Sequence, residues 1–127
     1  GAHIMVEPSD LTEDGGYHAA IRLLNSDEPP TGIFAVNDMS CIGALSAAAE
    51  FQIDVPGKLS LVGYDNSHLA RLRCLWLTSV DGAGFEVGRQ AAETLLARIE
   101  EPERPATVRL ITPKLEVRGS TAPPARG

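Results

Sequence analysis

The sequence predicts an α/β fold built around a doubly wound, mostly parallel sheet. Two observations favour this fold class. Short, continuous apolar runs of the kind found in covered strands alternate with longer segments in which apolar residues recur at helical spacing. Clusters of Pro, Gly, Asn and Asp separate these segments, which is typical of parallel strands joined by helical crossovers.

The spacing of the apolar residues predicts three helices. They cover residues 13–24, 38–51 and 85–100. Asp10 or Thr12 can cap the amino end of the first helix, and Pro29 and Pro30 follow its carboxyl end, where a helix cannot continue. The third helix has the most regular apolar stripe and ends before the proline-containing segment 101–105.

Five short segments are candidates for strands. They are residues 33–36, 59–64, 77–80, 108–111 and 115–117. The run from Ile33 to Val36 contains only apolar residues, and we expect it to form a strand that is covered on both faces. No internal repeat divides the chain, and its 127 residues fit one hydrophobic core.

Composition argues against several classes of protein. The net charge is −6, and the basic residues do not gather into the basic face that nucleic-acid binding requires. No apolar run approaches the ~20 residues of a membrane span, and no signal peptide opens the chain, so we expect a cytoplasmic protein without membrane contact. Cys41 and Cys74 are expected to be reduced thiols, and no residue spacing indicates a metal site.

Three polar clusters follow the three central strands. They are Asn37–Asp38, Asp65–Asn66 and Asp81. In parallel sheets ligands bind at the carboxyl ends of the strands, and paired carboxylates and amides suit the hydroxyl pairs of a sugar or the edge of a base. Helix capping and turn formation explain each cluster singly. Together, the clusters favour a binding cleft at this edge.

An enzyme is not supported by the sequence. Gly82, Gly84 and Gly88 do not reproduce the GxGxxG spacing of a dinucleotide site, so no cofactor is expected. No serine lies in the GxSxG motif of a nucleophile elbow, and no catalytic residue is predicted.

Several blocks match a known family in order and spacing. They are Pro30–Asp38, Ile42–Leu45, Val55–Asn66, Leu77–Val80 and Arg118–Thr121. From about Val6 to Thr121, the chain resembles transcriptional regulators of the LacI/GalR family. The resemblance implies a periplasmic-binding-protein-like domain of type I, with two subdomains flanking an effector cleft and a helix-turn-helix headpiece before them. Residues 6–75 and 107–121 would belong to the C-terminal subdomain, and residues 80–105 would cross to an N-terminal subdomain outside this chain.

The resemblance also implies which residues bind the effector, a small molecule that we expect to be a sugar. Asn37 and Asp65 match polar effector contacts, and Phe34 lies where some members touch the ligand. Leu11 stands where many members have an aromatic ring that stacks on the effector, and Gly82 where many have a glutamine. The implied mechanism is allosteric: the effector selects one closure of the two subdomains and so controls DNA binding by the headpiece.

The family pairs through its C-terminal subdomain, so a homodimer is expected. The interface would use the helix after Asn37–Asp38 and the segment after Tyr64–Asp65. Its residues would be Ile42, Leu45, Leu69, Leu72, Arg73 and Trp76. Trp76 is alternatively a core residue. A periplasmic-type sugar-binding protein shares the same fold and is the alternative function.

Overall fold

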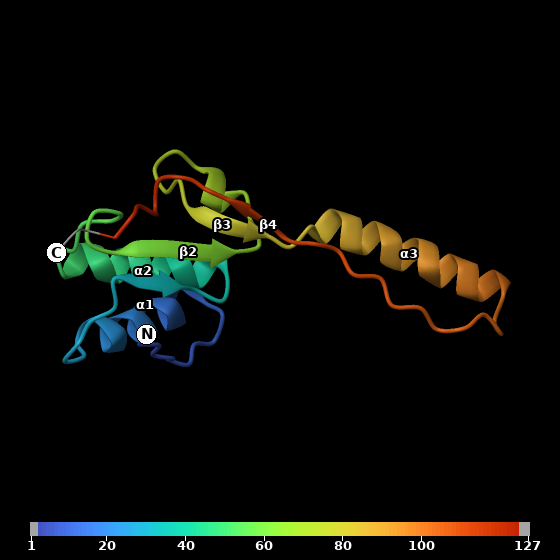
Figure 1. The fold of residues 1–127 in the computed structure, drawn as a ribbon, viewed down its shortest axis with the longest axis horizontal. Coiled ribbons are helices and arrows are strands. Elements are labelled where there is room, and N and C mark those ends of the chain that lie inside the picture. Colours follow the sequence, from blue (N-terminus) through green and yellow to red (C-terminus); the bar gives the residue numbers. More distant parts are fainter. Residues whose placement is uncertain (1–2, 125–127) are drawn as a thin grey trace.

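The computed structural model describes residues 3–124 and has one four-stranded sheet (Figure 1). The strands are β1 (Gly32–Phe34), β2 (Ser60–Tyr64), β3 (Thr78–Asp81) and β4 (Lys114–Glu116). They lie in the order β1-β2-β3-β4, with β1, β2 and β3 parallel and β4 antiparallel to β3. The predicted α/β fold with a mostly parallel sheet is therefore confirmed.

Two helices cover one face of this sheet. α2 (Asp38–Glu50) packs on β2, and α1 (Glu13–Leu24) packs on α2, so that α2 lies between α1 and the sheet (Figure 1). The bounds of α1 agree with the prediction, and Thr12 caps it by accepting a hydrogen bond from the Gly15 amide at 3.0 Å. Gly43 allows the two helices to approach closely, because a Cβ there would lie 2.0 Å from the Glu13 carbonyl oxygen.

The core lies between α1, α2 and the sheet and is made largely of small side chains. Its buried members are Ala20, Leu24, Ala35, Cys41, Ala44, Ala47, Ala48, Leu59, Leu61, Ala70 and Leu77. Because α2 contributes mainly alanines to this core, its backbone can pack close to the sheet. A short 3₁₀ turn, η1 (Leu69–Arg71), places Ala70 in the same core.

Two strand predictions were wrong. The first strand ends at Phe34, and its side chains are not covered on both faces: Phe34 is 65% exposed, because β1 lies at the edge of the sheet and the helices cover one face only. Residues 108–111 form no strand, since the chain there runs beside α3 rather than beside a strand with which it could pair (Figure 1).

The third helix, α3 (Gly84–Glu100), projects from the sheet, and residues 101–113 return along it (Figure 1). We call residues 84–113 the arm and the rest of the described chain the body. No residue of α3 is buried, although Phe85, Leu95, Leu96 and Ile99 are large and apolar. Within residues 3–124, no helix is long and apolar enough to cross a membrane.

Candidate functional site

The carboxyl ends of β1 and β2 lie side by side, because the two strands are parallel and Phe34 pairs with Val62. This brings the loops that follow the strands to one edge of the sheet. The loop before α1 reaches the same edge, where the Asn37 side-chain amide donates a hydrogen bond to the Leu11 carbonyl at 2.9 Å. The structure therefore joins two of the predicted effector residues directly, Leu11 and Asn37.

Asn37 also caps α2. Its side-chain oxygen accepts a hydrogen bond from the Ser40 amide at 2.8 Å. The capping role considered for this residue is thus confirmed, and it fixes the orientation of the side chain. An asparagine amide has two N–H donors, and one remains after the bond to Leu11, so the residue can still donate to a ligand.

Asp65 lies where β2 ends, and its backbone has a φ of 100°, a conformation that residues other than glycine rarely adopt. Its amide donates to the Val80 carbonyl at 2.9 Å, which ties the loop to β3. The carboxylate is exposed and makes no hydrogen bond within residues 3–124. The fold therefore fixes the backbone of Asp65 and leaves its carboxylate free to accept hydrogen bonds from a ligand.

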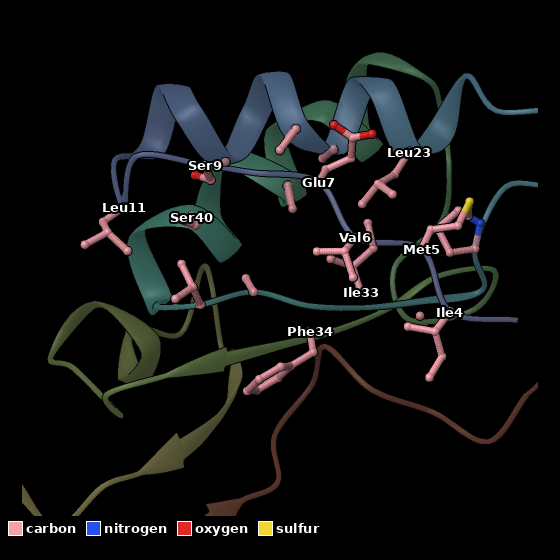
Figure 2. Close-up of a pocket in the computed structure, with 18 of the residues that line it drawn as sticks. Ile4, Met5, Val6, Glu7, Ser9, Leu11, Leu23, Ile33, Phe34 and Ser40 are labelled. Carbon is pink, nitrogen blue, oxygen red and sulfur yellow. The ribbon is translucent and has the colours of Figure 1, made fainter. Parts of the chain in front are cut away.

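Phe34 and Leu11 are both exposed and line a hollow of about 690 Å³ (Figure 2). The hollow lies between the amino-terminal segment, α1 and β1, and its lining is largely apolar, with Val6, Leu23 and Ile33 among its residues (Figure 2). Neither Asn37 nor Asp65 lines it. Asn37 and Asp65 thus lie at the carboxyl edge of the sheet, which we call the polar edge. Phe34 and Leu11 line the adjoining apolar hollow.

A buried hydrogen-bond network lies under the polar edge. Asp38 is buried at the first turn of α2, where the helix dipole favours a carboxylate. It accepts hydrogen bonds from the Ser79 hydroxyl at 2.6 Å and from the Ser67 amide at 2.7 Å. This carboxylate therefore joins the start of α2 to β3 and to the loop after β2, and both of its oxygens already accept a hydrogen bond.

Asn66 occupies the centre of the same network. Its amide nitrogen donates to the Asp81 carboxylate at 2.9 Å, and its side-chain oxygen accepts from the Arg118 guanidinium at 2.5 Å. The bond from Asn66 is the largest of the effects that lower the pKa of Asp81 below its ordinary value, followed by the bond from the Ala83 amide. The three polar clusters predicted at this edge do lie close together, but most of their side chains form hydrogen bonds within the protein.

Two residues of the network were not predicted from the sequence as site residues. Ser79 lies in the matched block Leu77–Val80 and Arg118 in the block Arg118–Thr121, but the sequence predicts no role in the site for either residue. Arg118 bonds Asn66 and the Leu77 carbonyl at 2.7 Å, and its guanidinium lies 5.7 Å from the centre of the Trp76 ring. The spacing along the chain gave no signal for this contact, because Arg118 lies 52 residues after Asn66.

The residues predicted for the dimer interface differ in exposure. Ile42 and Leu45 are half-buried against the core, Leu69 and Leu72 are half-buried near η1, and Arg73 and Trp76 are exposed. Trp76 is consequently not a core residue of the described chain. Whether these residues meet a second copy remains a prediction.

The candidate site contains no metal-binding arrangement. Within residues 3–124, no group of three or more His, Cys, Asp or Glu side chains is placed to hold an ion. Cys41 is buried in the core, where burial raises its pKa to about 12, and Cys74 is an exposed free thiol.

The chain matches the periplasmic binding protein-like domain family over residues 2–121. It is 36% identical to the HTH-type transcriptional repressor PurR of Glaesserella parasuis serovar 5, an alignment that covers 88% of this chain and 35% of that protein. The chain thus spans about a third of the length of that relative.

Solved structures give the same result. A LacI-family transcriptional regulatory protein from Corynebacterium glutamicum is 39% identical with a TM-score of 0.78, covering 88% of this chain and 43% of that one. A LacI family regulator from Enterococcus faecium with bound ribose is 34% identical with a TM-score of 0.82, covering 91% and 42%. The chain therefore belongs to the periplasmic binding protein-like domain family, in the form that LacI-family transcriptional regulators carry. The resemblance to LacI/GalR regulators is confirmed.

Proposed function

We propose that this chain is the effector-sensing and dimerisation part of a LacI-type transcriptional regulator of the cytoplasm, and that its effector is a sugar. The observation that carries the proposal is an exposed Asp65 carboxylate at the same carboxyl edge of a parallel sheet as Asn37 and Leu11. A free carboxylate and an amide donor at one edge suit a pair of sugar hydroxyls. A relative of the same fold was crystallised with ribose.

The mechanism is allosteric and not chemical. An effector at the polar edge would bridge the body and the subdomain to which the arm leads, and so favour one closure of the cleft. It can change DNA affinity only by as much as its affinities for the two closures differ. DNA binding itself would reside in a headpiece outside this sequence, since the chain has a net charge of −6.

A titration with D-ribose tests the effector site. We expect calorimetry to detect binding, and Asp65→Ala to weaken it more than about tenfold, because a hydrogen bond with a charged partner contributes about 1.5–3 kcal/mol. Asn37→Ala should weaken it less. Asp27→Ala removes an exposed carboxylate far from this edge and should change nothing. Unchanged affinity in both Asp65→Ala and Asn37→Ala would remove these residues from the site.

Association through the body is the second part of the proposal. We expect light scattering to give twice the 13.5 kDa mass of the chain at micromolar concentration. Ile42→Asp and Leu72→Asp place a charge in the proposed interface and should give monomers, since an unpaired charge is costly to bury. A monomeric wild type at high micromolar concentration would contradict the dimer, and a dimer that resists both substitutions would shift the interface to the exposed stripe of α3.

The fragment should not bind operator DNA on its own. A gel shift at physiological salt is expected to show no retarded band for this chain. Salt-sensitive binding below one micromolar would contradict the assignment of DNA binding to a separate headpiece.

A further inference from the structure

Asn66 differs from its neighbour Asp65 in how tightly the fold holds it. Its φ is 47° and that of Asp65 is 100°, so two successive residues other than glycine adopt left-handed conformations. Such conformations persist only where surrounding contacts enforce them. Asp65 has an exposed side chain, whereas Asn66 is 7% exposed and is bonded on all sides. Apart from the bond between the Asp65 amide and Val80, the hydrogen bonds that hold the turn therefore involve Asn66.

The contacts of Asn66 come from three elements. Its backbone amide donates to the Ser79 hydroxyl of β3 at 3.0 Å. Its carbonyl accepts from the Arg71 guanidinium of η1 at 3.2 Å. Its side chain bonds Asp81 at the end of β3 and Arg118 after β4. Asp81 precedes the arm in the sequence and Arg118 follows it, so these two partners connect Asn66 to both ends of the arm.

The arm joins the body at two places, and both of these reach Asn66. On the outgoing side, one oxygen of Asp81 accepts from Asn66 and the other accepts from the Ala83 amide at 2.8 Å, in the turn that leads into α3. On the returning side, Arg118 follows β4 and holds the side-chain oxygen of Asn66. A rotation of the arm that moves either connection must change the bonds of this one side chain.

We infer that Asn66 is a positioning residue that couples both connections of the arm to the conformation of Asp65. That Asp65 contacts the effector rests on the proposed function, but the coupling itself does not. In this arrangement, Asp81 and Arg118 set the orientation of the Asn66 amide, the amide sets the left-handed turn, and the turn sets the direction of the Asp65 carboxylate. By linkage, a ligand that fixes Asp65 also restricts the arm.

A double-mutant cycle read at the Asp65 amide tests this inference in the full 127-residue chain. That amide donates to Val80, so its hydrogen-exchange rate reports opening of the turn. Asp81→Asn and Arg118→Met should each accelerate its exchange about tenfold. Asp81→Asn removes the charge and one of the two acceptor oxygens, and Arg118→Met removes the guanidinium donor altogether. The double variant should accelerate it less than the product of the two, since both act through one side chain. Arg118→Lys, which keeps the charge but not the two-pronged geometry, should lie between wild type and Arg118→Met.

Arg109→Met is the matched control, because this arginine lies on the returning part of the arm and makes no hydrogen bond or ion pair within residues 3–124. The amide of Ala48, which is buried in α2, serves as the reference for global unfolding. If Arg118→Met accelerates exchange at Ala48 as much as at Asp65, Arg118→Lys replaces Arg118→Met in the cycle. Unchanged exchange at Asp65, or effects that multiply independently, would overturn the coupling. A coupled cycle together with an Asp65 signal that D-ribose does not shift would leave the coupling intact and contradict the proposed sugar site.

Discussion

The body and the arm both contain helices with an apolar face, but only the body buries such a face. α1 and α3 both have apolar residues at helical spacing, yet α1 buries Ala19, Ala20 and Leu24, while α3 buries no residue. α2 covers the apolar face of α1, and no element of the described chain covers the face of α3. Apolar periodicity therefore specifies a helix and its apolar face, but not what covers that face. The stability of the body comes from packing, and that of the arm from local interactions.

The largest expected effect is in thiol reactivity, and it tests whether the core of the body is packed: Cys41 lies in that core and Cys74 on the surface of the body. Burial raises the pKa of Cys41 to about 12, so its reactive thiolate is on the order of a thousandfold rarer at pH 8 than for an ordinary thiol. We expect iodoacetamide to modify Cys74 quickly and Cys41 only after the body unfolds. Mass spectrometry of the labelled chain measures both. Leu96→Ala in the arm should not expose Cys41, and rapid modification of both thiols in the native chain would show that the core of the body is open.

The second largest effect is expected from truncating apolar side chains. Leu61 is fully buried in β2, so Leu61→Ala should lower the free energy of unfolding by about 2–5 kcal/mol. Leu96→Ala removes the same atoms from an exposed position on α3 and should change it by less than about 0.5 kcal/mol. Urea titration followed by circular dichroism measures both. Similar losses from the two variants would mean that α3 is packed against another surface in solution.

A smaller effect is expected from the helix caps. Thr12→Ala removes the side-chain bond to Gly15 and should cost about 1 kcal/mol, with α1 fraying at its amino end. α3 has no side-chain cap at Ala83, whose φ is 55°. Ala83→Gly should therefore leave stability unchanged or raise it slightly, because glycine adopts this conformation without strain. The same urea titrations give both values, and a loss on Ala83→Gly would contradict the description of this turn.

The smallest expected effect is the response of the arm to acid. Hydrogen bonds from Arg89, and then from Gln90, lower the pKa of Glu86 to about 2. A depressed folded-state pKa stabilises the helix above the ordinary value near 4.5, and this contribution is lost as the pH falls toward 2. The amide signals of α3 should shift over that range at low salt, and Glu86→Gln should abolish this part of the shift. If the amide signals of α3 shift equally in Glu86→Gln, the pH dependence must come from other carboxylates.

The sequence predicted the parts of the fold that depend on local signals. α1 has the predicted bounds because Thr12 caps it and prolines follow it. The strand predicted at residues 108–111 failed, because an apolar run becomes a strand only where a neighbour offers hydrogen bonds. The prediction that β1 is buried on both faces was wrong for a similar reason, since burial of a strand depends on which helices pack on the sheet.

The candidate site was predicted in the same uneven way. The rule for parallel sheets placed Asn37, Asp65 and Asp81 at one edge. It could not distinguish the exposed carboxylate of Asp65 from the buried one of Asp38, because spacing along the chain does not show which carboxylate finds a donor. Arg118 was beyond this reasoning, since it reaches the site from the far end of the sequence.

The contact between Arg118 and Trp76 places the tryptophan fluorescence of the protein at the junction between arm and body. Trp76 is the single tryptophan of the sequence, so the whole indole emission of the protein arises beside the returning connection of the arm. A guanidinium over an indole ring changes its electronic surroundings, and its departure would shift the emission. An unlabelled sample therefore carries its own fluorophore at the junction, and at a fixed state of association a shift of its emission reports a change at the returning connection of the arm.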